Sequence, residues 1–189
     1  MAERAVFGDV TASAVIENNK ASLKFMIADP KWWSPEDPNL YEGTLSLGSD
    51  VISTYFGIRE IGTGKFGANN RNYITLNGKP YYINGVLDQS FNPQGFFTLP
   101  SDDDCREEIL RLKRIGINMS RIHIKAEEPL KLYWADKLGL LIMEDIPCFW
   151  GEPLPDTQAQ YEIEMEEQIL RDRNHPSTFY WVIFNETWG

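Results

Sequence analysis

Residues 180–189 read YWVIFNETWG, and this stretch decides how the rest of the chain is interpreted. Residues 180–184 are all apolar, with the aromatic and β-branched side chains typical of a strand buried on both faces of a parallel sheet. Asn185 and Glu186 follow the strand at once, and then Trp188. Barrel enzymes hold their chemistry just past the C-terminal ends of such strands. We therefore expect Glu186 to lie among apolar rings, because burial raises the pKa of a carboxyl group as a proton donor requires.

The composition predicts a globular chain with an acidic surface. The 189 residues are 42% hydrophobic and 13% aromatic, which is enough for a substantial core. The net charge of −10 and the pI of about 4.7 argue against nucleic acid or an anionic membrane as a partner. Six Trp and eight Tyr suit carbohydrate binding, although any single ring is more often part of a core. Cys105 and Cys148 suggest neither a disulfide framework nor a zinc site.

The first sixty residues are typical of β-structure. Leu23, Phe25 and Ile27 alternate with other residues at a period close to two, and a second alternation covers residues 45–47. A Gly-Ser-Asp turn then precedes a strand over residues 51–56. Short strands separated by turns indicate a β-sandwich, yet a complete one needs about 100 residues. We therefore expect residues 1–62 to form part of an immunoglobulin-like sandwich that is incomplete at its start.

From residue 74 onward, strand and helix patterns alternate. The turn pair Asn77-Gly78 predicts a hairpin. Ser101 predicts the start of a helix, and Gly116 and Gly139 predict where two helices end. The expected elements are strands over 74–76, 81–87, 117–124, 140–146 and 180–184, with helices over 102–115, 130–138 and 158–173.

This alternation predicts βα units and therefore parallel strands. An open doubly wound sheet and a barrel both fit the pattern. No Gly-rich phosphate loop follows the first strand, which disfavours the nucleotide-binding version. A complete (β/α)₈ barrel needs about 250 residues. We therefore expect residues 63–189 to form the N-terminal half of such a barrel, so that the fold class is α/β with an all-β N-terminal part.

Polar side chains lie at the C-terminal ends of the expected parallel strands. Burying such groups without partners would cost several kcal/mol in aggregate. Four successive strand ends with polar groups are therefore a moderately specific sign of a functional site. The candidate residues are Asp88, Arg121, His123, Asp145, Asn185 and Glu186.

Each candidate also has a structural interpretation. Asp88 could cap a loop, and Arg121 and Asp145 could form an ion pair with no role beyond structure. His123 could be a hydrogen-bonded core residue. We expect Lys125 to be solvated, His175 to cap a helix end, and Glu144 to point away from Asp145 because neighbours in a strand alternate. Glu186 has the weakest structural interpretation, because both of its flanks are apolar.

The motifs together resemble one family of glycosidases. WSPEDPNLY at 33–41 and FGIREI at 56–61 are similar to the end of its immunoglobulin-like domain. LNGKP at 76–80 and NGV at 84–86 are similar to its entry into the barrel. Asn185-Glu186 after an aromatic strand completes the likeness to glycoside hydrolase family 2, the family of β-galactosidases, β-glucuronidases and β-mannosidases.

The resemblance implies specific roles at the strand ends. It implies that Glu186 is the general acid/base of a retaining β-glycosidase, and that Asn185 contacts the sugar 2-hydroxyl. Arg121 and Asp145 fall on positions that order the site, and Trp188 would form an aromatic wall. Many family members carry Ser-His-Tyr-Pro after the arginine, whereas this chain reads RIHIK at 121–125. The sugar specificity of the family therefore does not transfer directly.

The resemblance also implies missing parts. Family members add an N-terminal sugar-binding domain and the remainder of the barrel, whose second glutamate is the nucleophile. We therefore expect a carbohydrate substrate, no cofactor, no metal and no activity of this chain alone. The alternative is a non-catalytic carbohydrate-binding or interaction fragment. A third interpretation, an unrelated parallel α/β enzyme, would need a cofactor motif that the sequence lacks.

Overall fold

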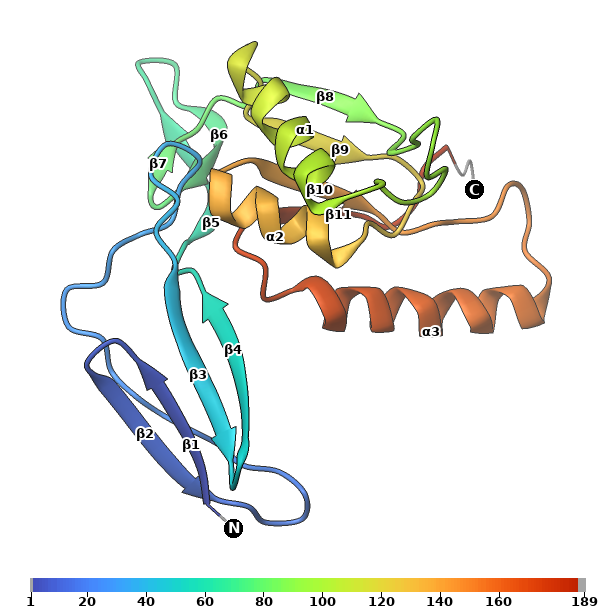
Figure 1. The fold of residues 1–189 in the computed structure, drawn as a ribbon. Helices are drawn as coiled ribbons and strands as arrows, with labels where there is room; N and C mark the ends of the chain where they lie inside the picture. Colours follow the sequence, from blue (N-terminus) through green and yellow to red (C-terminus); the bar gives the residue numbers. More distant parts are fainter. Residues whose placement is uncertain (1, 187–189) are drawn as a thin grey trace.

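The computed structural model describes residues 2–186, which form three β-sheets and three α-helices. The first sheet is antiparallel, with strand order β2-β1-β3-β4, and Figure 1 shows it extending away from the helices. The expected turn at residues 48–50 is confirmed, and β3 and β4 pair with each other on either side of it. The strands of this sheet are β1 (Ala2–Phe7), β2 (Val10–Val15), β3 (Tyr41–Leu47) and β4 (Asp50–Phe56).

The strand expected around Leu23, Phe25 and Ile27 is wrong. These residues have no regular secondary structure and pair with no strand. The ring of Phe25 stacks on Phe7 with 5.3 Å between centroids, and it lies 5.9 Å from the ring of Phe56. The apolar residues of this segment therefore cover the sheet through aromatic packing, which needs no ladder of backbone hydrogen bonds.

A small antiparallel sheet connects the first sheet to the rest of the chain. It contains β5 (Ile61–Phe66), β6 (Arg71–Leu76) and β7 (Lys79–Pro80). Asn77 and Gly78 form its turn with φ of 53° and 75°, which confirms the predicted hairpin.

The continuous strand expected over 81–87 is wrong, because the next strand, β8 (Gly85–Asp88), begins only at Gly85. The side chain of Asn118 accepts a hydrogen bond from the Asn84 amide at 2.8 Å and donates to the Tyr82 carbonyl at 2.8 Å. These side-chain bonds take the place of strand pairing and redirect the chain into the following sheet.

The third sheet is parallel, and its order β11-β10-β9-β8 follows the sequence. The predicted alternation of parallel strands and helices is confirmed. Figure 1 shows α1 and α2 side by side against this sheet, and α3 beneath it. The elements that follow β8 are α1 (Asp102–Arg114), β9 (Met119–Ile122), α2 (Pro129–Leu138), β10 (Leu141–Asp145), α3 (Pro155–Asp172) and β11 (Thr178–Val182). Closure into a barrel, the immunoglobulin-like sandwich and the division at residues 62 and 63 stay predictions.

The helix ends follow the residues that predict them. The Ser101 side chain accepts a hydrogen bond from the Asp104 amide at 3.2 Å, and Gly139 ends α2 in the left-handed conformation. None of the described helices is long and apolar enough to cross a membrane. Between these helices and the sheet lies a core of fully buried side chains. The core residues are Ile109, Ile122, Leu132, Ala135, Leu140 and Ile142.

The last strand lies two residues earlier than predicted. The sequence favours a strand over 180–184, whereas β11 covers Thr178–Val182. The register explains the shift, because Ile142 of β10 pairs with Thr178 and donates to the Ser177 carbonyl at 2.8 Å. As a result, residues 183 and 184 leave the sheet and separate the strand from Asn185 and Glu186.

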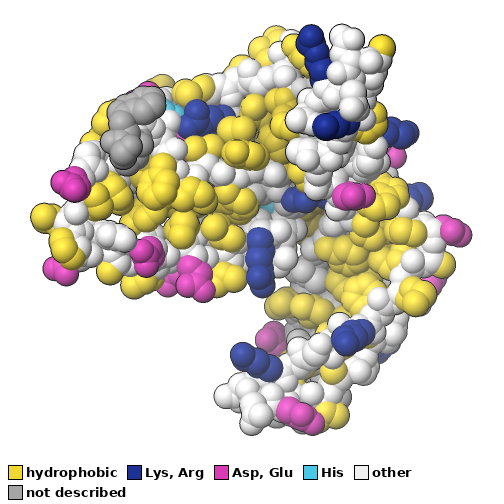
Figure 2. Space-filling model, turned by 180° about the vertical axis from the view of Figure 1, so that it is seen from behind, with side chains coloured by type: hydrophobic (Ala, Val, Ile, Leu, Met, Phe, Trp, Pro, Cys, Tyr) yellow, Lys and Arg dark blue, Asp and Glu magenta, His cyan; other side chains and the backbone are white. Residues whose placement is uncertain are grey.

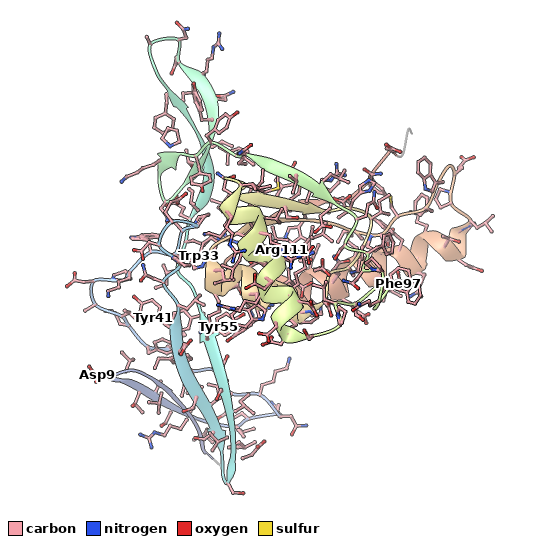
Figure 3. The ribbon with its side chains drawn as sticks, turned by 45° about the horizontal axis from the view of Figure 1, so that its top comes forward. Asp9, Trp33, Tyr41, Tyr55, Phe97 and Arg111 are labelled. Carbon is pink, nitrogen blue, oxygen red and sulfur yellow. The ribbon has the colours of Figure 1, made fainter. Side chains whose placement is uncertain are left out.

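Asp136 of α2 is one point at which the first sheet and the loop before β3 are attached to the parallel part. The Trp33 indole donates to the Asp136 carbonyl at 2.8 Å, and the Tyr55 hydroxyl donates to its carboxylate at 2.8 Å. Figure 3 shows Trp33 and Tyr55 close to the helices. His175 Nδ1 lies 2.5 Å from the same carboxylate, so its side chain joins this contact rather than capping a helix end. The Ser177 amide also donates to Asp136 at 2.9 Å, which fixes the start of β11.

Replacement of Gly139 by Ala tests this junction. Gly139 has φ of 76°, and an added Cβ would lie 2.4 Å from the Pro35 carbonyl oxygen. Lys113 holds that carbonyl through a 2.8 Å hydrogen bond, so it resists displacement. The matched control is Gly116→Ala, which has φ of 84° and no atom within 4 Å of the added Cβ.

Gly116→Ala should lower the free energy of unfolding by about 1–2 kcal/mol, the cost of a left-handed residue with a side chain. We expect a clearly larger loss for Gly139→Ala in urea denaturation. Equal losses for the two variants would contradict the close approach of the loop at Pro35 to α2.

Candidate functional site

The C-terminal ends of β9 and β10 and the segment after β11 are joined by one guanidinium group. Arg121 Nε and Nη2 donate to the two carboxylate oxygens of Asp145 at 2.9 and 2.8 Å. Arg121 Nη2 also donates to Asn185 Oδ1 at 2.7 Å. The register makes this possible, because Arg121 pairs with Met143, two residues before Asp145, and its long side chain reaches the strand end. Three of the predicted site residues therefore meet at one point.

Charge and burial strengthen this arrangement. The Asp145 side chain is fully buried, while the Arg121 side chain is 27% exposed. The Ile124 amide also donates to Asp145 at 3.2 Å. The hydrogen bond that Arg121 donates to Asp145 is the main cause that raises the pKa of Arg121 above its ordinary value, so the guanidinium stays charged. A bidentate pair of this kind fixes direction as well as distance.

Glu186 directly follows Asn185, which Arg121 binds, but the Glu186 side chain is not enclosed. The charge of Glu186 adds to the raised pKa of Arg121, but it contributes less than Asp145 does. The Glu186 side chain is exposed, so the expectation that apolar rings surround it is wrong within the described residues. Its backbone has φ of 51°, a left-handed conformation that is uncommon outside glycine. Trp188, the expected aromatic wall, lies outside the described residues.

Asp88 belongs to a different cluster. Its carboxylate accepts from Lys131 Nζ at 2.8 Å and from the Ser90 amide at 2.7 Å. Burial raises the pKa of Asp88, but the charge and hydrogen bond of Lys131 outweigh burial and hold the pKa below its ordinary value. The structure therefore places Asp88 against α2 rather than beside Arg121.

His123 is held by its neighbour on the preceding strand end. Gln89 Nε2 lies 2.7 Å from His123 Nδ1, and the His123 amide donates to the Asp88 carbonyl at 2.9 Å. If Nδ1 accepts from the Gln89 amide, the ring proton is on Nε2. His123 is half-buried at the rim and is not hydrogen-bonded to the Arg121 group among the described contacts.

The sequence interpretation missed a buried charge cluster. Lys131 and Glu127 are both fully buried and lie 3.2 Å apart. Lys131 also lies 3.3 Å from Glu108, and Lys125 lies 3.1 Å from Glu127. The expectation that Lys125 is solvated is wrong, because its side chain is only 11% exposed. The spacing of Glu127 and Lys131, four residues apart, was the available signal for this cluster.

Glu144 points to the opposite face from Asp145, as predicted from strand alternation. Its carboxylate accepts from the Thr178 hydroxyl at 2.7 Å and lies 3.4 Å from Gln168 Nε2. Burial raises the pKa of Glu144 to about 7, and the charge of Asp172 adds to the effect. Among residues 2–186, no three His, Cys, Asp or Glu side chains converge as a metal site would require.

Comparisons with known proteins show that the chain resembles one family. Residues 3–59 match the family described as "Glycosyl hydrolases family 2". A protein from Formosa agariphila that is provisionally named a beta-glucuronidase is 30% identical over 94% of this chain. A beta-galactosidase from Pectobacterium atrosepticum is 26% identical over 97% of this chain. This chain spans 18% of the length of each of these two relatives.

Solved structures agree with the sequence relatives. A family 2 beta-galacturonidase from Eisenbergiella tayi, bound to galacturonate, aligns with a TM-score of 0.81 at 27% identity. That alignment covers 98% of this chain and 34% of the beta-galacturonidase. The Bacteroides uniformis beta-glucuronidase 3 aligns with a TM-score of 0.79 at 24% identity, over 95% of this chain and 23% of that chain, which shows the same fold. The resemblance to family 2 is therefore confirmed.

Replacement of Arg121 by Met should destabilise the chain, because it leaves the buried Asp145 carboxylate without its cation. We expect a loss of about 3 kcal/mol in the free energy of unfolding, at the lower end for a broken buried pair because Arg121 is 27% exposed. The control is Arg114→Met, whose side chain is 63% exposed beside Glu107 and should change stability by less than about 0.5 kcal/mol. Similar effects of the two variants in urea denaturation would contradict the assignment of Arg121 as the group that joins the strand ends.

Replacement of Glu144 by Gln should change how stability depends on pH. The folded-state pKa of Glu144 is raised to about 7 from an ordinary value of 4.5, so its contribution is fully present below 4.5 and is lost as the pH rises through 7. In the wild type, the free energy of unfolding should therefore fall by about 3 kcal/mol over this window. Glu144→Gln removes this titration, and its stability should change less over the same range. Parallel pH profiles for the two proteins would show that Glu144 is ionised in the fold.

Proposed function

Because this chain resembles glycosyl hydrolase family 2, we propose that it forms part of the catalytic region of a retaining β-glycosidase, with Glu186 as the general acid/base. The observation that carries the proposal is the Arg121 group. One guanidinium joins Asp145 and Asn185 at the C-terminal edge of a parallel sheet, and Glu186 is the residue next to Asn185. This is the edge where barrel enzymes place their catalytic side chains.

The proposal includes the architecture around the site. We infer that residues 63–189 are the first half of a (β/α)₈ barrel and that residues 1–62 belong to an immunoglobulin-like sandwich. The sequential order β8-β9-β10-β11 supports the barrel, because consecutive barrel strands are neighbours. β11 pairs only with β10 among the described strands, so its other edge is available for a fifth strand.

An apolar groove supports the same architecture. The groove has a volume of about 930 Å³ and lies between α3 and the segment after β11. Figure 2, seen from behind the view of Figure 1, shows hydrophobic side chains gathered across this face of the molecule. In a barrel, the next strand and helix would cover this surface. The lining side chains include Phe149, Tyr161, Met165, Ile169, Ile183 and Phe184.

The proposed reaction needs two carboxyl groups: Glu186 of this chain as the acid/base and a second carboxylate as the nucleophile. In the first step, Glu186 gives its proton to the glycosidic oxygen while the second carboxylate attacks the anomeric carbon and the aglycone leaves. In the second step, Glu186 takes a proton from water, and the water oxygen displaces the carboxylate from the sugar. Retaining enzymes hold the two carboxyl groups about 5–5.5 Å apart. The nucleophile would come from the remainder of the barrel.

Asn185 and Arg121 would orient the sugar. Since Arg121 donates to Asn185 Oδ1, the amide is fixed with its Nδ2 group turned away from the guanidinium. An amide donor in this orientation suits the oxygen of the substrate 2-hydroxyl. His123 would form one wall of the sugar site and Trp188, which lies outside the described residues, would form another, while Asp88 would act only through the strand end that it supports. The exposed Glu186 carboxyl would then lose water when the sugar binds.

Replacement of Glu186 by Gln tests the proposal in the polypeptide that carries this chain. Without an acid, kcat on alkyl β-glycosides should fall by about 10²–10⁴-fold, because these leaving groups need protonation. Dinitrophenyl glycosides leave without protonation and should lose much less in the first step. β-Galactosides, β-glucuronides and β-galacturonides form the substrate panel, since the relatives carry these names.

The matched control is Glu167→Gln, an exposed carboxylate on α3 outside the groove that should leave all rates unchanged. Unchanged hydrolysis of alkyl glycosides by Glu186→Gln would remove Glu186 from the mechanism. Binding of sugars without hydrolysis of any substrate would favour the alternative of a non-catalytic carbohydrate-binding fragment.

A further inference from the structure

The segment after β11 is held by side chains from three other elements. Residues 183–185 have left the sheet, so strand pairing does not fix them. We propose that Cys148 and Tyr161 are positioning residues that set the direction of Asn185 and Glu186 for catalysis. This inference rests on the proposed function, because it assigns the pair a role in that reaction.

Cys148 contacts both polar backbone groups of Asn185. Its Sγ accepts from the Asn185 amide at 3.4 Å and donates to the Asn185 carbonyl at 3.5 Å. Cys148 lies in the loop that follows β10, three residues after Asp145. The thiol therefore connects the end of β10 to the residue that precedes the proposed acid/base. A thiol has one weak donor and a weak acceptor, so a single side chain suffices for both contacts.

Tyr161 of α3 holds the same segment two residues earlier. Its hydroxyl donates to the Ile183 carbonyl. The ring is only 7% exposed, and it packs against Phe149 at 5.5 Å and Phe184 at 5.4 Å between centroids. Burial raises the pKa of Tyr161 to about 12, so the phenol remains a donor at neutral pH.

The anchors determine where the Glu186 carboxyl points. Arg121 fixes the Asn185 side chain, while Cys148 and Tyr161 fix the backbone on either side of residue 184. Glu186 then follows with φ of 51°, a conformation that persists only where the surroundings hold it. Loss of an anchor would let residues 185 and 186 relax toward ordinary dihedral angles. The carboxyl would turn away from the position beside Arg121.

The catalytic test uses Cys148→Ala in the polypeptide that carries this chain. We expect kcat on alkyl β-glycosides to fall on the order of tenfold with little change in KM, because a misplaced acid slows proton transfer more than it weakens binding. Dinitrophenyl glycosides should be nearly unaffected. Cys148→Ser keeps a donor and an acceptor and should restore part of the loss. Tyr161→Phe should show the same preference for activated leaving groups.

Cys105→Ala is the control, since Cys105 is buried in α1 away from the site and should leave this preference unchanged. If Cys148 had only a structural role, Cys148→Ala would lower kcat on all substrates to the same extent and would also lower the melting temperature. That result, or equal losses on alkyl and dinitrophenyl glycosides, would overturn the positioning role.

Amide hydrogen exchange in the 189-residue chain tests the anchor without any assay of hydrolysis. In Cys148→Ala, the Asn185 amide should exchange at least about tenfold faster, whereas amides between β10 and β11 should not change. Unchanged exchange at Asn185 would overturn the anchor. If the wild-type polypeptide hydrolyses no glycoside, the proposed function fails by itself, and faster exchange would still establish Cys148 as the anchor of Asn185.

Discussion

The buried carboxylate of Asp145 is the constraint on which the candidate site depends. A carboxylate with no exposed surface needs a cation and further donors, and Arg121 and the Ile124 amide supply them. Because the guanidinium is bidentate toward Asp145, its remaining donor has little freedom, and it reaches Asn185. One electrostatic requirement therefore sets the relative positions of β9, β10 and the segment after β11, and Glu186 follows from them.

The opposite end of the same strands is fixed by a second buried carboxylate. Asp136 of α2 accepts hydrogen bonds from Tyr55 and from the start of β11, while its carbonyl accepts from Trp33. The N-terminal part of the chain thus helps to position the start of β11, the end of the strand opposite the Arg121 group. Asp136 therefore holds the start of β11, and Arg121 holds Asn185 after its end. Both ends of this five-residue strand are fixed by side chains from other elements.

The local sequence predicted most helices, strands and helix ends, whereas strand register, burial and side-chain partners depend on contacts between distant residues. Ser101 and Gly139 predicted helix ends because capping depends on neighbouring residues alone. The Arg121–Asp145 pair was one of two open interpretations from sequence, since strand adjacency makes it possible without requiring it. The two-residue shift of β11 depends on its register with β10. The exposure of Glu186, the burial of Lys125 and the contact of Cys148 with Asn185 likewise depend on residues far away in sequence.

The central claim is that Arg121, Asp145 and Asn185 together present Glu186 to a sugar. A crystal structure of the polypeptide that carries this chain, bound to the lactone of its preferred sugar, would test that claim most directly. We expect the lactone to lie over Asn185, with the Glu186 carboxyl toward the anomeric side and a second carboxylate about 5–5.5 Å from it. A lactone bound elsewhere, or a Glu186 carboxyl turned away from Arg121 in the complex, would contradict the account.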